Sequence, residues 1–137
     1  MSRVTAFAEA CAPHALSLFR IVTALLYLEH GTAKLFHFPH VKMFDGLPIF
    51  SLYGAAGMIE VVGSLFLLFG LFVRPVAFLL SGEMAIAYFH DHAPWSFFPL
   101  LNEGEPAVFY CFAFLYFAAA GGGPWSLDAF RARRAGV

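Results

Sequence analysis

The segment LLYLEHGTAKLFHF, residues 25–38, places an acid, an imidazole and an amine inside a stretch that is otherwise largely apolar. Its leucines and aromatic residues are typical of a helix that crosses a lipid bilayer, whereas Glu29, His30 and Lys34 are not. Ionisable side chains within a spanning helix usually face the protein interior or a polar cavity. We therefore predict a membrane helix over residues 15–38 with one face directed into the protein.

The polar face of this helix follows from the helical repeat. Residues three, four and seven positions apart lie on the same face of a helix. By that rule Tyr27, His30, Lys34 and His37 form one stripe, and Glu29 lies at its edge. We expect this stripe to face the neighbouring helices.

The composition of the whole chain indicates a membrane protein. The 137 residues are 61% hydrophobic and 12% charged, whereas about 25% of residues are charged in ordinary soluble domains. We predict a single membrane domain over residues 1–137, with the lipid bilayer as its environment. The net charge of −1 gives no basis for binding nucleic acid, which requires a basic surface.

Four segments approach the length and hydropathy of spanning helices, which need about 20 mainly apolar residues. Prolines and glycines separate them, and they cover residues 15–38, 52–73, 75–90 and 106–121. No small-residue cleavage site follows the first apolar run, so we expect a retained helix and not a signal peptide. The predicted fold is all-α, an integral membrane bundle of four transmembrane helices followed by a short basic tail, 122–137.

The basic residues predict the orientation of this bundle. Lysine and arginine are enriched in the short flanks on the cytoplasmic side of spanning helices. With four spans, one side collects Arg3, Arg20, Arg74, Arg131, Arg133 and Arg134. We therefore predict a multi-pass protein of the inner membrane with both termini in the cytoplasm. The tail has two open interpretations, a short interfacial helix with its arginines at the lipid headgroups or a frayed basic segment.

The other predicted helices also carry ionisable residues, mostly in their middle and outer parts. A charge at a helix centre costs about 2.5–3.5 kcal/mol on insertion scales. We therefore expect Glu60 and Glu83 to face the interior, where they are protonated or paired with Lys34 or His30. His90, Asp91, His92, Glu103 and Glu105 extend this polar set toward the outer end.

Carboxyl and imidazole groups near mid-membrane suit proton-coupled chemistry on a lipid-soluble quinone. In this interpretation Glu60 and Glu83 are catalytic and handle protons. The residues that bind the quinone or an outer-side substrate are Glu29, His30, Lys34, His90 and Glu105. A metal site is an alternative, with His90, His92 and His30 as weak candidates. Haem is a further alternative that no motif supports.

Several short motifs in one order carry a resemblance to a known family. They are HGTAKL at 30–35, GMIEVVGSLFLLFGLFVRPVA at 57–77, GEMAIAYFHDH at 82–92 and GGGPWSLD at 121–128. Together they resemble the DoxX-like family of small four-helix membrane proteins over residues 17–128. Lys34, Glu60, Glu83, His90 and Glu105 match polar positions of the family pattern.

The resemblance implies a redox role. The family includes a subunit of a thiosulfate:quinone oxidoreductase and members tied to membrane-associated redox and thiol-stress complexes. It thus implies a quinone and a partner redox subunit, and leaves open whether this chain is itself an enzyme. The alternatives are a non-catalytic membrane scaffold or assembly partner, a small-solute or proton pathway, and a homo-oligomer of any of these.

Overall fold

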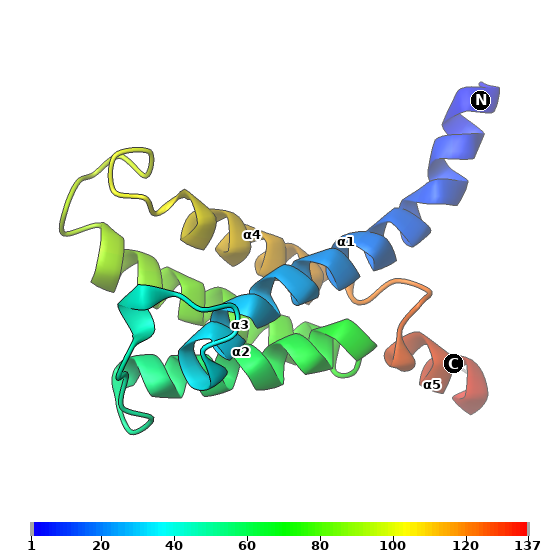
Figure 1. Ribbon diagram of the computed structural model, residues 1–137. Coiled ribbons are helices and arrows are strands. Elements are labelled where there is room, and N and C mark those ends of the chain that lie inside the picture. Colours follow the sequence, from blue (N-terminus) through cyan, green and yellow to red (C-terminus); the bar gives the residue numbers. More distant parts are fainter. Residues whose placement is uncertain (1, 137) are drawn as a thin grey trace.

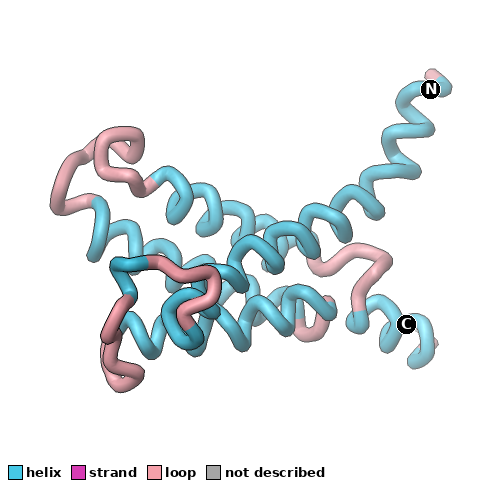
Figure 2. Tube along the Cα trace, in the orientation of Figure 1, coloured by secondary structure: helices cyan, strands magenta, loops and turns pink. Residues whose placement is uncertain are grey.

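The computed structural model describes residues 2–136, and within that range it is helical throughout with no strand. Figure 1 shows the helices in sequence colours and Figure 2 the loops between them. The five α-helices are α1 (Arg3–Phe36), α2 (Leu52–Phe69), α3 (Val73–Ala87), α4 (Glu105–Ala120) and α5 (Leu127–Ala135). A 3₁₀ turn, Lys42–Phe44, lies in the first loop, and α3 continues directly into a π-helical turn, Tyr88–His92.

The four longer helices pack in pairs. α1 lies along α2, α3 lies along α4, and α2 and α3 form a hairpin that joins the pairs, while α1 and α4 touch over a short stretch only. Their shared core includes Tyr27, Leu67, Leu80, Phe114 and Phe117. In Figure 1 the two termini and α5 lie at one end of the molecule, and the loops before α2 and before α4 lie at the other.

Glycine permits the closest helix approach. A Cβ atom on Gly31 of α1 would lie 2.7 Å from Val61 Cγ2 and 2.9 Å from the Gly57 carbonyl oxygen on α2. Such distances are too short for any side chain, so the two helix backbones meet at this point. This approach brings the polar stripe of α1 against α2.

The start of α1 differs from the sequence-based prediction. The helix begins at Arg3, not at residue 15, because Ser2 caps it by accepting a hydrogen bond from the Thr5 backbone N–H. It then runs through Pro13, and this first part of α1 turns away from the other helices in Figure 1. Proline inside a helix removes a backbone donor and bends the helix.

The end of α2 also differs from the prediction, which extended it to Val73. The helix ends at Phe69 because Gly70 adopts the left-handed conformation, with φ of 70°. Its N–H donates to the Leu67 carbonyl oxygen, and the Leu71 N–H donates to that of Phe66. This is a glycine C-cap of the Schellman type. Val73 begins α3 instead.

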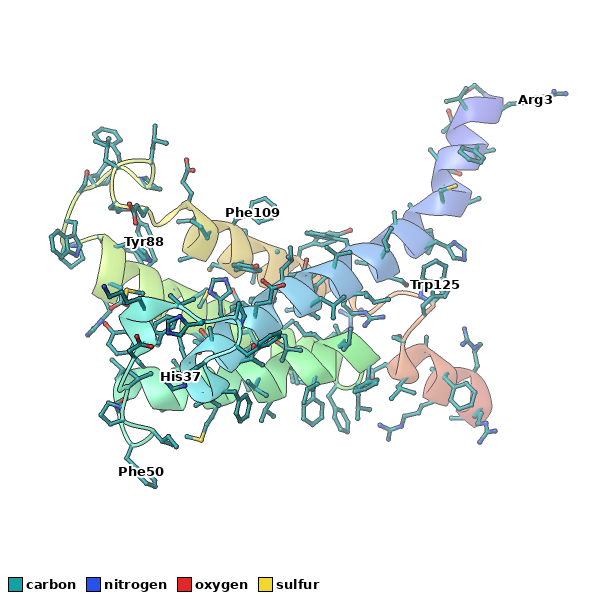
Figure 3. All side chains as sticks on the ribbon, viewed as in Figure 1. Arg3, His37, Phe50, Tyr88, Phe109 and Trp125 are labelled. Atoms are coloured by element: carbon teal, nitrogen blue, oxygen red, sulfur yellow. The ribbon has the colours of Figure 1, made fainter. Side chains whose placement is uncertain are left out.

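The surface of the molecule is largely apolar. α1 and α2 are long and apolar enough to cross a bilayer by length and composition, and α4 is a shorter apolar helix. Large hydrophobic side chains point outward over all the longer helices, as Phe109 on α4 and Phe50 before α2 show in Figure 3. Exposed apolar patches of this extent are typical of a lipid-facing surface. The prediction that α3 and α4 also span the membrane stays a prediction.

Arg20 is the largest fully buried side chain in the molecule, with none of its surface exposed. Its Nε donates to the Gly122 carbonyl oxygen at 2.9 Å, and its Nη2 to that of Trp125 at 2.6 Å. Its Nη1 donates to the Leu68 carbonyl oxygen at 2.8 Å and also to that of Leu67. One guanidinium thus joins α1, the C-terminal end of α2 and the loop before α5.

Asp128 completes this junction from α5. Its two carboxylate oxygens accept hydrogen bonds from the Phe72 and Val73 backbone N–H groups, both at 2.9 Å. Its own N–H donates to the Gly70 carbonyl oxygen at 2.9 Å. The tail is therefore a helix held against the α2–α3 turn and not a frayed segment.

We expect Arg20→Lys to lower the free energy of unfolding in detergent by about 3 kcal/mol, since each buried carbonyl left unpaired costs about 1–3 kcal/mol. Lysine keeps the positive charge but lacks the planar array of donors that reaches four carbonyls. Denaturant unfolding followed by circular dichroism measures the effect. The matched control is Arg3→Lys at an exposed position. If both variants are as stable as the wild type, Arg20 acts only as a charge that sets topology.

Candidate functional site

The interior of the helix packing holds an ion pair between α1 and α2. Lys34 Nζ lies 2.5 Å from Glu60 Oε1, and the Glu60 side chain is 3% exposed. The Phe44 ring of the first loop covers the amine, with its centroid 5.8 Å from Nζ. The predicted pairing of Lys34 with an acid of the second helix is confirmed. Their roles in binding or catalysis stay predictions.

A second contact joins α1 to α3. Tyr27 is almost fully buried, and its hydroxyl donates to Glu83 Oε2 at 3.1 Å. Glu83 is therefore held by a neutral donor, whereas Glu60 faces an ammonium. Glu60 and Glu83 thus meet two members of the predicted α1 stripe, Lys34 and Tyr27. The other two members differ from the prediction, because His30 is exposed and His37 lies exposed beyond the end of the helix, which its left-handed conformation terminates.

Three buried polar atoms in this region have no hydrogen-bond partner among residues 2–136. They are Glu60 Oε2, Glu83 Oε1 and the Ser64 hydroxyl oxygen. Ser64 lies one helical turn from Glu60 on the same face of α2. Buried polar groups in proteins are nearly always paired, so these oxygens are candidate acceptors or donors for a proton or for a polar group of a ligand.

Aromatic rings separate this polar interior from the α1–α4 side. The Tyr110 ring of α4 packs 5.1 Å from that of Tyr27 and 5.7 Å from that of His30, measured between ring centroids. The Phe114 ring stacks 5.8 Å below Tyr110 and 4.8 Å from Tyr27. Tyr110 of α4 is thus in contact with two members of the α1 stripe, Tyr27 and His30.

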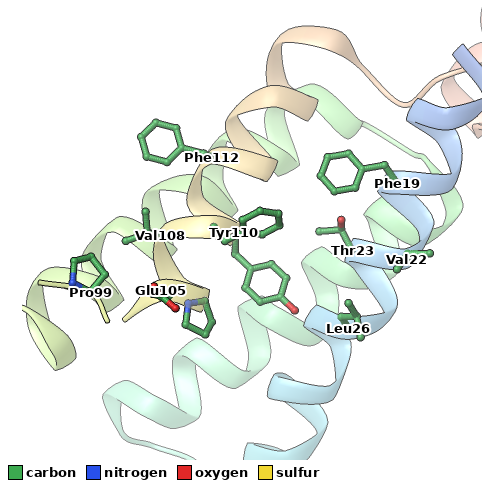
Figure 4. Close-up of a pocket in the computed structure, with 11 residues that line it drawn as sticks. Phe19, Val22, Thr23, Leu26, Pro99, Glu105, Val108, Tyr110 and Phe112 are labelled. Atoms are coloured by element: carbon green, nitrogen blue, oxygen red, sulfur yellow. The ribbon is translucent and has the colours of Figure 1, made fainter. Parts of the chain in front are cut away.

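A groove of about 770 Å³ runs between α1 and α4 (Figure 4). Phe19, Val22 and Leu26 form its α1 side, and Val108 and Phe112 lie on its α4 side. Its polar members are Thr23, Tyr110 and Glu105. Since Tyr110 also contacts Tyr27 and His30, a single aromatic layer separates the groove from the polar interior.

The structure distributes the other predicted site residues over different places. Glu29 is exposed on α1, outside the buried contacts. Glu105 is the first residue of α4 and lines the groove. His90 lies beyond the C-terminal end of α3, in the π-helical turn. Lys34, Glu60 and Glu83 therefore form the central set, and the exposed residues Glu29, His30 and His90 are peripheral to it.

The histidines of the predicted metal site have other contacts. His90 Nδ1 lies 2.7 Å from Asp91 Oδ1, and His92 Nδ1 lies 2.8 Å from the Asn102 carbonyl oxygen. His30 packs on Tyr27 and Tyr110 instead. Over residues 2–136 the fold gathers no group of three or more histidine, cysteine or acidic side chains suited to a metal ion.

Asp91 links the N-terminal end of α2 to the π turn after α3. The Tyr53 hydroxyl donates to Asp91 Oδ1 at 2.7 Å, the same oxygen that faces His90. Burial alone would raise the pKa of the Asp91 carboxyl, but hydrogen bonds from His90 and Tyr53 and the histidine charges outweigh it. The pKa of Asp91 therefore lies below its ordinary value.

Sequence reasoning missed Arg20 as a buried residue and Tyr110 as part of the site. Arg20 was assigned to a basic flank, because its position near the start of an apolar run resembles a topology signal. The hydroxyl group of Tyr110, in a largely apolar helix, is the sequence feature that could have indicated its place in the site. Its contact with α1 depends on how α4 is rotated, which the apolar sequence of α4 does not reveal.

Comparison with known proteins identifies the family. Residues 15–93 match the DoxX family model. A Haemophilus influenzae protein described as uncharacterized is 45% identical over 121 residues, which cover 85% of this chain and 90% of that protein. No solved structure matches the chain. The chain belongs to the DoxX family, and this membership and its long apolar helices indicate a membrane protein.

The Lys34–Glu60 pair generates a stability prediction. Removing one partner of a buried pair leaves an uncompensated charge and costs about 3–5 kcal/mol, whereas replacing both is often nearly neutral. We expect Lys34→Met to destabilise the protein by an amount in this range, and the double variant Lys34→Met/Glu60→Gln to recover most of the loss. Denaturant unfolding in detergent measures both. Lys42→Met, at an exposed lysine, is the control, and strict additivity of the two single changes would contradict a coupled pair.

The Asp91 contacts generate a pH prediction. A carboxyl whose pKa is lowered by folding contributes stability above its unfolded pKa of about 4, and this contribution is lost as the pH falls through the folded value. Asp91→Asn should therefore lower Tm at pH 7, with a difference that shrinks below about pH 4. Asp45→Asn is the control, because its pair with His40 is exposed and such pairs add little stability. A constant difference at all pH values would show that the Asp91 charge is not the cause.

Proposed function

We propose that this DoxX protein is a multi-pass inner-membrane protein that binds a quinone and serves as a redox subunit. The observation that carries the proposal is the α1–α4 groove, which is apolar and open at the surface of two apolar helices. Two aromatic rings, Tyr110 and Tyr27, connect it to Glu83. A lipid-soluble molecule in the bilayer has access to such a groove without crossing water.

The proposed topology has four spanning helices. α3 has 15 residues and continues without a break into the π turn, so the helix up to His90 approaches the length of about 20 residues that spanning requires. Asp91 then lies just beyond the span, at the membrane interface. Arg20, Arg74 and the α5 arginines lie at the end of the molecule that holds both termini. By the bias of basic residues toward the cytoplasm, this end is the cytoplasmic one.

The groove suits the two parts of a quinone differently. Phenylalanine, valine and leucine side chains supply an apolar wall for an isoprenoid tail. Polar groups lie beside this wall, where Tyr110 packs on the buried Tyr27 and on the exposed His30. Ligand sites are commonly apolar clefts with a few polar groups that fix orientation. We assign His30 and Tyr110 as the groups that orient the head group.

Protons reach this head group from the acids behind it. Reduction of a quinone to a quinol takes two electrons and two protons. Glu83 is hydrogen-bonded to Tyr27, and each of Glu60 and Glu83 retains one buried oxygen with no partner among the described residues. These carboxyls hold and transfer protons in the proposal, and Lys34 keeps Glu60 oriented. The electrons come from a partner redox subunit.

A groove-filling variant tests where a quinone binds. We expect Leu26→Trp to weaken binding of a short-chain quinone analogue by at least about tenfold, because the larger ring occupies the groove that Leu26 lines. Leu79→Trp is the matched control, since Leu79 lies exposed on α3 outside the groove. Binding is measured by titration calorimetry on the detergent-solubilised protein. Equal binding by both variants and the wild type would contradict the α1–α4 location.

Substitution of the acids tests their roles. Glu83→Gln preserves shape but cannot release a proton, so we expect weaker analogue binding and loss of its pH dependence. Glu60→Gln should also weaken analogue binding, because it leaves the Lys34 ammonium without its carboxylate partner. Binding unchanged in both variants would remove the assigned proton roles.

The second candidate function is a non-catalytic assembly partner, favoured by the short contact between α1 and α4. In that case the groove receives a helix of another subunit and not a quinone. Co-purification of a second subunit that Leu26→Trp abolishes, with no quinone bound to either variant, would favour this alternative.

A further inference from the structure

We propose that the basic end of the molecule contains a binding site for the phosphate headgroup of an anionic phospholipid. The site is a second groove, of about 450 Å³, between the start of α3, the glycine loop after α4 and α5. It is independent of the quinone proposal, because it shares no lining residue with the α1–α4 groove.

Two arginines flank this groove. Arg74 lines it, and its Nη1 donates to the Ala118 and Ala119 carbonyl oxygens at the end of α4. Its Nε and Nη2 have no hydrogen-bond partner within residues 2–136. Both nitrogens lie close to Gly121, since a Cβ atom added to that glycine would be 3.6 Å from each of them. The guanidinium is therefore held in place while two of its nitrogens face the groove region.

The second arginine comes from α5. Arg131 lies over the Phe72 ring, with Cζ 5.3 Å from its centroid, and Phe72 lines the groove. Arginine is well suited to phosphate because its planar array of N–H donors matches the phosphate oxygens. A phosphate held between Arg74 and Arg131 would thus gain charge-assisted hydrogen bonds from two helices.

The carboxylate of Asp128, which lies in this groove, repels an anion only weakly. Asp128 lines the groove, but both its carboxylate oxygens accept backbone hydrogen bonds at the start of α3. Arg133 and Arg134 add further positive charge on α5. At the groove itself, Arg74 and Arg131 therefore face one carboxylate whose oxygens are already engaged, which complements an anion.

Several features favour a lipid over a free anion as the occupant. Trp125, Leu127 and Phe130 are exposed, and Arg134 lies over the Phe130 ring, with Cζ 4.7 Å from its centroid. Exposed aromatic residues interleaved with arginines are typical of a segment at the membrane interface, where long cationic side chains reach the headgroups. The groove wall itself includes apolar or small residues: Phe72, Pro75, Ala129 and Ala132. The phosphate of a lipid headgroup matches the arginines, and the start of the acyl chains matches the apolar and small residues of the wall.

The test uses the full-length protein in detergent, titrated with dihexanoyl-phosphatidylglycerol or dihexanoyl-phosphatidylcholine and observed by native mass spectrometry. These lipids have the same chains and differ in headgroup charge. We expect the phosphatidylglycerol to bind at least about tenfold more tightly. Arg131→Gln should reduce its affinity toward that of phosphatidylcholine, and Arg74→Gln should do the same if it folds. Arg3→Gln, which removes the same charge at the far tip of α1 (Figure 3), should have no effect.

Three outcomes would overturn the proposal. Equal affinity for the two lipids would show that headgroup charge is not recognised. Equal losses in Arg131→Gln and Arg3→Gln would show attraction to overall charge and no defined site. Displacement of the phosphatidylglycerol by an equal concentration of inorganic phosphate would identify free phosphate as the ligand. None of these results bears on quinone binding.

Discussion

The buried guanidinium of Arg20 is the contact on which the arrangement of the helices depends. A charge in an apolar interior is stable only when it is paired and hydrogen-bonded. Here its partners are backbone carbonyl oxygens, two of them at the C-terminal end of α2, where the helix dipole is negative. The Leu67 carbonyl oxygen also accepts from the Gly70 N–H of the helix cap, and the last carbonyls of a helix otherwise lack a partner within it. One side chain therefore satisfies α2 while it connects α1 to the loop before α5.

The two halves of the molecule use polar groups in contrasting ways. At the basic end, Arg20 and Asp128 bond to backbone groups whose positions are set by helix ends and turns. In the other half, Lys34, Glu60, Tyr27 and Glu83 bond to one another and leave carboxylate oxygens without partners in the described chain. Contacts between side chains of that kind can rearrange when an acid gains or loses a proton, whereas the guanidinium of Arg20 keeps its charge and its carbonyl partners.

Part of this arrangement could be predicted from the sequence. Hydropathy indicates the helices, and the cost of burying charge indicates that Glu60 and Glu83 face the interior, with pairing to Lys34 as one of the alternatives that the structure then selects for Glu60. The start of α1 was missed because residues before Pro13 are too polar to resemble a spanning segment. The end of α2 was missed because the apolar sequence continues past Gly70. The groove was missed because α4 is apolar on every side, so no periodicity reveals which side faces α1.

The partners of Arg20 also impose an order on assembly. The Gly122 and Trp125 carbonyl groups lie 102 and 105 residues after it in the chain. Ribosomes deliver α1 long before those carbonyls exist, so during synthesis its guanidinium lacks half of its final partners. Contacts of such long separation form late, because loop closure must precede them. The contacts that attach α1 to the loop before α5 can therefore form only after α4 and the glycine loop have been synthesised.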